Sequence, residues 1–250
     1  MPDVRVYTFS ALFDGLPAGG PFDLKLLAWL NLAKIPYSHK FQDDTRKGPK
    51  GKNPWIELDG ERIGDSEIII SRLGSKFGVD LEAGLSAEQA AVAHVWRRTF
   101  EEHFHQVFEW ELLVHPAGAE FMRGVMATQM PPVIGGVIFR MMQRGMSKQL
   151  YARGLARHSP DVIEAKGRQD VDALSHYLGD RQFLLGKKPS MADTAVFGQL
   201  APMMVWPMKT PVALHVRTLP NLVAYCERMR ELCFVTGPSA FAARPASARR

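Results

Sequence analysis

The sequence predicts an α/β domain followed by an all-α domain. The α/β domain is indicated by a β-hairpin pattern, in which two runs of strand-forming residues flank the turn dipeptide Asp59-Gly60. A strand, a helix and a second strand are indicated before the hairpin. In the all-α domain, apolar residues recur at helical spacing and no convincing strand is found. The expected boundaries are residues 1–78 for the first domain, 79–85 for a linker, 86–236 for the helical domain and 237–250 for a basic, disordered tail.

Composition sets the broad class of the protein. A chain of 250 residues with 46% apolar residues can bury a sizeable core. The net charge is +5, but the basic residues are scattered, which argues against nucleic-acid binding. Cys226 and Cys233 lie seven residues apart in one helical pattern, so they cannot bridge each other, as expected in a reducing compartment. No secretory leader precedes the first strand, and the apolar run over residues 131–139 is too short to span a bilayer. We therefore expect a cytoplasmic protein without a transmembrane segment.

The first domain follows the order strand, helix, strand, connection, hairpin, helix. Pro21 falls at the first position of the first helix, and Pro36 ends that helix. Asp65-Ser66 supplies an N-cap for the second helix. The polar connection between the second strand and the hairpin leaves room for a short helix. We expect strands over residues 4–9, 37–42, 55–58 and 61–63, and helices over residues 21–34 and 66–77. This βαβ–ββα order resembles a thioredoxin-like domain.

In the second domain, a capping-box pattern at Ser86–Gln89 begins a long helix. The apolar residues expected along one side of this helix are Val92, Val95, Trp96, Phe100, Phe104, Val107, Phe108 and Leu112. Further helices are expected over residues 147–156, 160–178, 190–200 and 221–232, with interrupted structure over residues 116–144. Pro202, Pro207 and Pro211 predict an irregular path between the last two helices.

A candidate anion site lies around the hairpin. The N-cap at Asp65-Ser66 leaves backbone N–H groups free at a helix start, and such groups attract anions. Pro54 precedes the first hairpin strand, where it cannot donate to the strand ladder. A cis bond at Pro54 would leave the backbone of the preceding residue available to a ligand, whereas a trans proline at a strand start is the simpler alternative.

These segments resemble a known family. The run from Asn53 to Gly60, followed by Asp65-Ser66, is similar to the second half of the thioredoxin-like domain of the glutathione S-transferase superfamily. The α/β thioredoxin-like half and the all-helical half together resemble the cytosolic glutathione transferase architecture. The segments that narrow the resemblance to the failed-axon-connections and metaxin-like branch are Gly20–Tyr37, the run from Gly51, Gly154–His158 and Asp170–Asp193.

The resemblance implies a set of glutathione contacts. Asn53 and Pro54 would meet the cysteinyl part of glutathione, and Asp65 and Ser66 would hold its γ-glutamyl end. Lys52, with Lys50, lies where a basic residue would neutralise the glycyl carboxylate, although a solvated charge run explains these lysines equally well. The family likeness also implies a homodimer.

The expected thiol-activating side chain is missing. In relatives with a Ser-Pro-Phe or Cys-Pro-Phe start, the catalytic residue precedes the proline, and here that residue is Gly20. The cysteine of the branch is replaced by Asp23, whose carboxylate would favour the helix start but disfavour a thiolate. Tyr7, Thr8 and Ser10 are the remaining hydroxyl candidates. Ser10 is preferred as the catalytic residue, because it follows the first strand directly, and ordinary strand and loop polarity is the alternative.

A possible metal-binding spacing and a group of methionines are two further features of the sequence. Glu102 and His105 have a spacing found in di-iron bundles, but no second copy occurs, so no metal site is expected. The methionines between Met122 and Met146, with Met203, Met204 and Met208, either line an adaptable apolar cavity or fill the helix core, and the core is slightly favoured.

The sequence therefore predicts a transferase-like protein that binds glutathione as a co-substrate in its first domain. Its reaction would be thiolate attack on an apolar electrophile, or a glutathione-dependent variant such as isomerisation or reduction. A thiol–disulfide oxidoreductase is excluded, because no cysteine lies in the first half. A non-catalytic, metaxin-like binding or assembly module is the alternative. Gly20 favours that alternative, whereas Asn53-Pro54 and Asp65-Ser66 favour glutathione.

Overall fold

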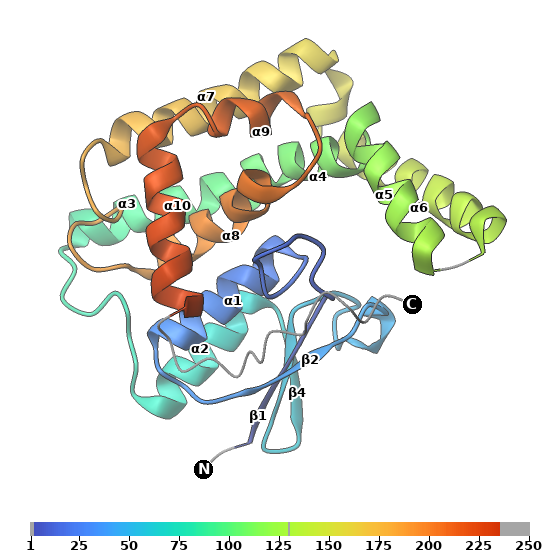
Figure 1. Ribbon diagram of the computed structural model, residues 1–250. Coiled ribbons are helices and arrows are strands. Elements are labelled where there is room, and N and C mark those ends of the chain that lie inside the picture. Colours follow the sequence, from blue (N-terminus) through green and yellow to red (C-terminus); the bar gives the residue numbers. More distant parts are fainter. Residues whose placement is uncertain (1–2, 130, 236–250) are drawn as a thin grey trace.

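The computed structural model describes residues 3–129 and 131–235, and Figure 1 shows a sheet below a larger group of helices. The sheet contains β1 (Val4–Thr8), β2 (Ser38–Phe41), β3 (Trp55–Leu58) and β4 (Glu61–Gly64) in the order β2-β1-β3-β4. β1 and β2 are parallel, and the other pairs are antiparallel. Helices α1 (Pro21–Leu32) and α2 (Ser66–Phe77) lie between the sheet and the other helices. A thioredoxin-like half followed by a helical half is therefore confirmed.

The hairpin between β3 and β4 forms as its turn dipeptide predicts. Asp59 and Gly60 have φ values of 51° and 87°, the positive pair that a type I′ turn requires. Leu58 pairs with Glu61, so the loop has two residues. The predicted first two strands and first helix end one or two residues earlier than expected, and the predicted short helix occurs as the 3₁₀ turn η1 (Thr45–Lys47).

The helical half begins with α3 (Ala87–Arg98), the π-helical segment η2 (Thr99–Phe104) and α4 (His105–Leu113). The capping box at Ser86 and Gln89 is present. The remaining elements are α5 (Pro116–Gln129), α6 (Pro132–Ala152), η3 (Leu155–Arg157), α7 (Pro160–Leu178), α8 (Met191–Val205), α9 (Pro211–Val216), α10 (Pro220–Arg230) and η4 (Glu231–Val235). None of the helices over the described residues is long and apolar enough to cross a membrane.

Three expectations for this half were wrong. Val95 is 59% exposed, because at 100° per residue it lies about 200° around α3 from the buried Ala93. Helix α8 continues through Pro202 to Val205, because a proline removes only one helical bond and this helix is buried along almost its whole length. Of the expected helix over residues 147–156, residues 147–152 are helical, but the bounds were wrong, because these residues belong to α6, which begins at Pro132 and ends at Ala152.

Helix α8 joins the two halves by packing against α1. At Gly198 a Cβ would lie 2.3 Å from the Pro21 carbonyl oxygen, so only glycine permits this close approach. Lys25 of α1 forms a buried ion pair with Glu101 of η2. These contacts fix the start of α1 on the helical half. The inferred domain boundaries stay predictions, and residues 237–250 lie outside the described chain. Cys226 and Cys233 are both buried and free, as predicted.

Candidate functional site

The start of α2 is capped by Asp65. Its Oδ1 atom accepts hydrogen bonds from the backbone N–H groups of Glu67, at 3.0 Å, and Ile68, at 3.3 Å. Ser66 is the first residue of the helix and is only 6% exposed. The N-cap predicted from the sequence is therefore present, with the Ser66 side chain next to it at the positive end of the helix dipole.

The turn before β3 lies beside this helix start. The Asn53–Pro54 peptide bond is cis. Trp55 pairs with Gly64 across the hairpin, so the next residues outward, Pro54 and Asp65, are neighbours at the same end of the two strands. The structure thus brings together the residues that the sequence placed around glutathione.

Asn53 is held by its amide. Its Nδ2 donates to the Gln42 carbonyl oxygen at 2.6 Å, and its Oδ1 is buried with no hydrogen-bond partner among residues 3–129 and 131–235. A buried acceptor without a partner is uncommon in proteins. Lys52 and Lys50 are exposed on the same turn, and the stem of Lys50 lies against Gly64. Lys50 therefore lies close to the start of α2, whereas Lys52 is on the exposed turn before Asn53.

At the start of α1, the carboxyl group of Asp23 occupies the space of the missing side chain. A Cβ at Gly20 would lie 2.6 Å from Asp23 Oδ2 and 3.0 Å from the Phe9 ring. Asp23 Oδ2 accepts the backbone N–H of Phe9 at 3.0 Å. Gly20 has φ −100° and ψ 141°, which any residue can adopt, so the carboxyl group and the ring alone exclude a side chain. Burial raises the pKa of Asp23 well above its ordinary value, although bonds from Phe9 and Gly20 oppose that rise.

The three hydroxyl candidates lie in different surroundings. Tyr7 Oη donates to Glu57 at 3.0 Å, and its ring stacks on Trp55 with centroids 3.8 Å apart. Thr8 points to the buried side, where its Oγ1 lies 2.7 Å from His39 Nε2. Ser10, alone of the three, lies in the loop before α1. Its carbonyl oxygen packs closely against Gly19, where a Cβ would lie only 2.7 Å from it.

Ser10 is bound by an acidic partner that the sequence did not indicate. Its Oγ donates to Asp43 Oδ2 at 2.7 Å, and its backbone N–H donates to Asp43 Oδ1 at 2.8 Å. The hydroxyl proton is therefore directed at a carboxylate. A nearby carboxylate also disfavours a thiolate. Trp55 is 3% exposed and lies between Tyr7 and Arg62, so it belongs to the core of the sheet-bearing half.

An ion-pair network behind Ser66 was not found from the sequence. Glu67 binds Arg97, at 2.9 Å, and Arg98 of α3, and Arg98 also binds Glu101 at 3.0 Å. Burial tends to raise the pKa of Glu67, but the hydrogen bond from Arg98 and the nearby cations outweigh it and lower the pKa. The network ties the start of α2 to the helical half. A local sequence pattern could not predict this network, because Glu67 is about 30 residues away from Arg97 and Arg98 in the sequence.

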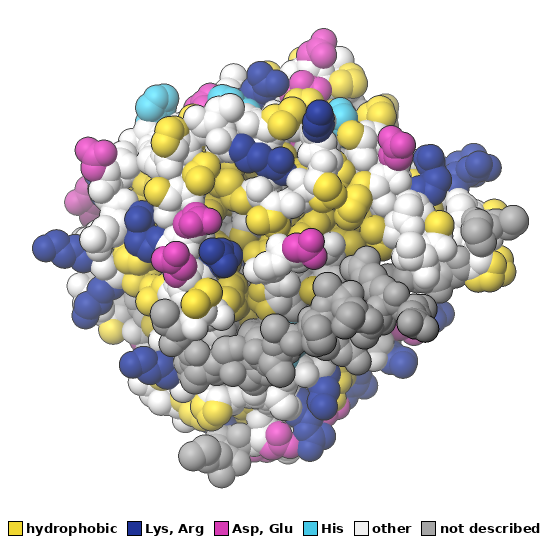
Figure 2. Space-filling model, in the orientation of Figure 1, with side chains coloured by type: hydrophobic (Ala, Val, Ile, Leu, Met, Phe, Trp, Pro, Cys, Tyr) yellow, Lys and Arg dark blue, Asp and Glu magenta, His cyan; other side chains and the backbone are white. Residues whose placement is uncertain are grey.

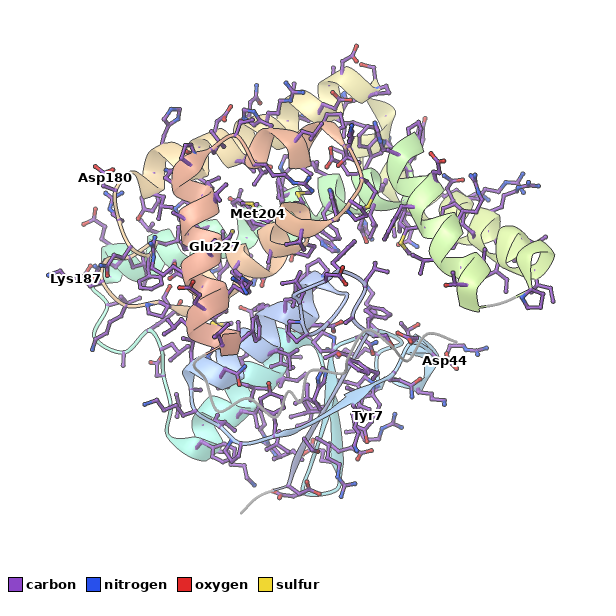
Figure 3. The ribbon with its side chains drawn as sticks, in the orientation of Figure 1. Tyr7, Asp44, Asp180, Lys187, Met204 and Glu227 are labelled. Carbon is purple, nitrogen blue, oxygen red and sulfur yellow. The ribbon has the colours of Figure 1, made fainter. Side chains whose placement is uncertain are left out.

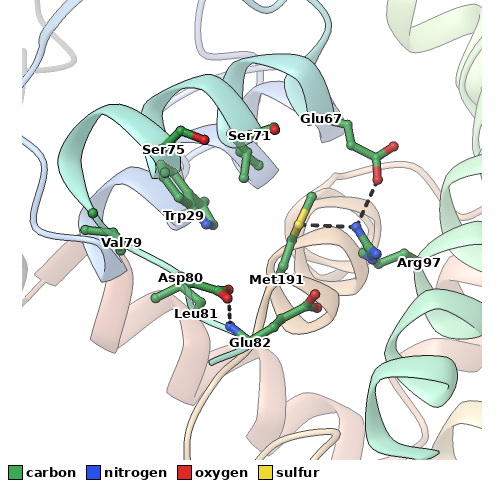
Figure 4. Close-up of a pocket in the computed structure, with 13 residues that line it drawn as sticks. Trp29, Glu67, Ser71, Ser75, Val79, Asp80, Leu81, Glu82, Arg97 and Met191 are labelled. Atoms are coloured by element: carbon green, nitrogen blue, oxygen red, sulfur yellow. Dashed lines mark hydrogen bonds and ion pairs between the residues drawn. The ribbon is translucent and has the colours of Figure 1, made fainter. Parts of the chain in front are cut away.

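A cavity of about 640 Å³ lies beside this network, and Glu67 and Arg97 are in its lining. Figure 4 shows the residues that line it. Trp29, Arg97 and Met191 line it, together with α2 and residues 78–82. Arg97 contacts both Glu67 and the Met191 sulfur. Glu82 lies in its wall, and burial raises the pKa of that carboxyl group.

A smaller cavity of about 240 Å³ lies between α8 and α10, on the face where Figure 2 shows hydrophobic side chains gathered over the helical half. Met204, labelled in Figure 3, lines this cavity with Leu16 from the loop before α1. Met203 and Met208 are buried in the core. The two explanations for the methionines therefore each apply to some of them.

The histidines of the Glu-x-x-His pattern have protein partners. His103 Nδ1 lies 2.6 Å from Asp170, and this contact raises the pKa of His103. His105 lies 3.1 Å from Gln199 and 3.5 Å from Glu109. Within the described part of the chain, no three histidine, cysteine, aspartate or glutamate side chains are grouped as a metal site would need.

Known proteins resemble this chain over nearly its whole length. Family models described as "Glutathione S-transferase N-terminal domain" and "Glutathione S-transferase, C-terminal domain" match residues 21–118 and 167–229. An isoprene-epoxide–glutathione S-transferase of Rhodococcus sp. (strain AD45) is 32% identical over 91% of this chain and 98% of its own length. The chain belongs to the glutathione S-transferase superfamily. Two further relatives come from Drosophila melanogaster and from human. Failed axon connections of Drosophila melanogaster is 29% identical over 92% of this chain, which spans 58% of that protein.

Human metaxin-1 is 27% identical over 88% of this chain, which spans 49% of metaxin-1. Among solved structures, the β-etherase LigF from Sphingobium sp. strain SYK-6 superimposes with a TM-score of 0.60 at 19% identity. That alignment covers 97% of this chain and 96% of LigF. The structural likeness shows that the transferase architecture is complete over both halves.

Proposed function

We propose that this protein binds glutathione at the junction of the hairpin and α2. The observation that carries the proposal is the meeting of the Asn53–Pro54 turn with the capped start of α2. The backbone of the cis Asn53–Pro54 turn and the start of α2 at Ser66 supply polar groups there for a ligand. Membership of the transferase superfamily, and a relative whose name specifies glutathione, support the same ligand.

Each residue of the site has a role in this proposal. The Ser66 hydroxyl and the Ser66 backbone N–H bind the γ-glutamyl carboxylate, which the helix dipole favours, while Asp65 keeps the N–H groups of Glu67 and Ile68. Asp65 attracts the γ-glutamyl ammonium group while its Oδ1 keeps the cap. The backbone of Asn53, held in place by Pro54, meets the cysteinyl part. Lys52 neutralises the glycyl carboxylate, and its exposed position allows it to do so without a desolvation cost.

The chemistry that follows from this placement is thiolate attack on an apolar electrophile. The sulfur forms a bond to the electrophilic carbon, the bond from that carbon to its leaving atom breaks, and the leaving atom takes a proton from solvent. Gly20 provides no side chain that could cap α1, so backbone N–H groups at the start of α1 are available to the sulfur. In this proposal the Ser10 hydroxyl donates a hydrogen bond to the sulfur of glutathione. It can do so once its hydrogen bond to Asp43 is broken.

Calorimetric titration with glutathione tests the binding. We expect saturable binding that weakens about fivefold or more in Ser66→Ala, because a hydrogen bond to a charged group is lost. Ser71→Ala removes an exposed serine from the same helix and serves as the control, with unchanged affinity expected. No binding at millimolar glutathione would overturn the proposal.

Thiol activation has its own test. If Ser10 donates to the sulfur, Ser10→Ala lowers the rate constant for a model electrophile and leaves glutathione affinity almost unchanged. Asp43→Ala removes both acceptors of Ser10, which frees its hydroxyl and raises the rate. A protein that binds glutathione but shows no turnover in any of these variants would instead fit the non-catalytic module, which Gly20 favours. Homodimerisation stays a prediction from the family, tested by sedimentation equilibrium.

A further inference from the structure

Helices α5 and α6 form a hairpin that projects from the body of the helical half (Figure 1). One face of α6 is buried against its neighbours. Phe139 and Leu150 are 1% and 0% exposed, and Gly135 lies against the α5 backbone at Met126. Neither family model matches residues 119–166, which contain most of this hairpin. The two family models therefore say nothing about the surface of this hairpin.

The opposite face of α6 is apolar and exposed. Ile134, Val137 and Met141 are 53%, 53% and 67% exposed, and Ile138 and Met142 are 38% and 36% exposed. At 100° per residue these five residues fall within about 140° of the helix circumference, and this arc does not overlap the arc that contains Gly135, Phe139 and Leu150. A helix that is apolar on both its buried and its exposed face requires a second apolar partner.

Basic residues run along one edge of this exposed face. Arg140, Arg144 and Lys148 are spaced four residues apart and are all exposed, so they form a continuous row next to Val137 and Met141. Helix α6 contains no aspartate or glutamate, and α5 contains a single one, Glu120. The hairpin therefore presents an apolar stripe with a cationic border and almost no negative charge.

We infer that this face of α6 lies on an anionic lipid surface. An interfacial helix buries its apolar face at the boundary between headgroups and acyl chains, and its basic residues meet the lipid phosphates. A second copy of this chain fits less well. A twofold interface places the same surface against itself, so the row of cations would face cations without a matching carboxylate on α6. The apolar stripe fits either partner, whereas the positive charge of the row favours an anionic lipid surface over a second copy of this chain.

Vesicle sedimentation with the full chain tests the inference. The probes are phosphatidylcholine vesicles with about one third phosphatidylserine, and phosphatidylcholine vesicles alone. We expect binding to the anionic vesicles that weakens as salt is raised. The triple variant Arg140→Gln, Arg144→Gln, Lys148→Gln should lower the partition coefficient about a hundredfold, because each basic residue at the surface contributes about fivefold.

A matched control separates a local surface from overall charge. Arg168→Gln, Lys187→Gln, Lys188→Gln removes the same charge from exposed positions, and Lys187 lies on the other side of the view from α6 (Figures 1 and 3). This control should bind the anionic vesicles like the unmodified protein.

The apolar stripe is tested by Val137→Asn, Met141→Gln. These exposed side chains are outside the core, so thermal stability should stay the same while vesicle binding falls. Equal binding to both vesicle types, or equal loss in the triple variant and its control, would overturn the inference. Self-association that Met141→Gln abolishes, without lipid binding, would assign the face to a second copy.

Discussion

Substitution of Gly20 by serine introduces a side chain immediately before Pro21, and the structure predicts that Asp23 rejects it. The new Cβ would lie 2.6 Å from Asp23 Oδ2, well inside ordinary van der Waals contact. Overpacking of a buried site costs about 1–3 kcal/mol. A serine N-cap regains only a few tenths of a kcal/mol over glycine. We therefore expect Gly20→Ser to lower the free energy of unfolding by about 1–2 kcal/mol, which lowers Tm by roughly 2–8 °C.

Asp23→Ala provides the matched background, because it removes the carboxyl group that the serine would meet. Asp23→Ala alone is destabilising, since the Phe9 N–H loses its acceptor. In that background, Gly20→Ser should be close to neutral, so the double-mutant cycle should give a coupling of about 1–2 kcal/mol. The assay is urea denaturation of the four proteins at constant m-value. Additive effects within about 0.5 kcal/mol would refute the reasoning, because Asp23 would then not be what excludes a side chain at Gly20.

Three further predictions concern stability. Lys25→Met should cost about 1–3 kcal/mol, because the buried Glu101 loses one of its two cationic partners and keeps only Arg98. Lys25→Met with Glu101→Met should regain most of that loss in urea denaturation, and equal losses would contradict the pairing. Burial raises the pKa of Glu111, which accepts a hydrogen bond from Thr210, to about 7. The folded state then binds more protons than the unfolded state, so stability should fall by on the order of 3 kcal/mol from pH 4.5 to above pH 7, and Glu111→Gln should flatten this dependence in thermal melts. A slope that survives the substitution would assign the pH dependence to another group. Ser86→Ala should cost about 1 kcal/mol through its capping box, and no measurable loss would mean that the box does not stabilise α3.

Much of the sheet-bearing half was predictable because its signals are local. The Asp59-Gly60 turn needs only two positive φ values, and the bounds of α2 follow from its cap at Asp65 and its end at Gly78. The residues expected around glutathione lie together because β3 and β4 pair through that same turn. Their placement was thus encoded in a short stretch of sequence, whereas their binding role is a proposal.

The remaining features depend on contacts between distant residues. Gly20 and Asp23 were each noticed as departures from the family pattern, but only the folded loop shows that the carboxyl group fills the space of the missing side chain. The Asp43 carboxylate that holds Ser10 comes from the connection after β2, 33 residues away. Helix α8 tolerates Pro202 because tertiary burial outweighs the lost backbone bond, and propensity alone does not register such burial.

The most direct test of the account compares two ligands on two proteins. Calorimetry is performed with glutathione and with cysteinylglycine, which lacks the γ-glutamyl group, on the unmodified protein and on Ser66→Ala. If the start of α2 binds the γ-glutamyl end, the substitution weakens glutathione about fivefold or more and leaves cysteinylglycine unchanged. Equal losses for both ligands, or no binding of glutathione at millimolar concentration, would contradict the proposed site.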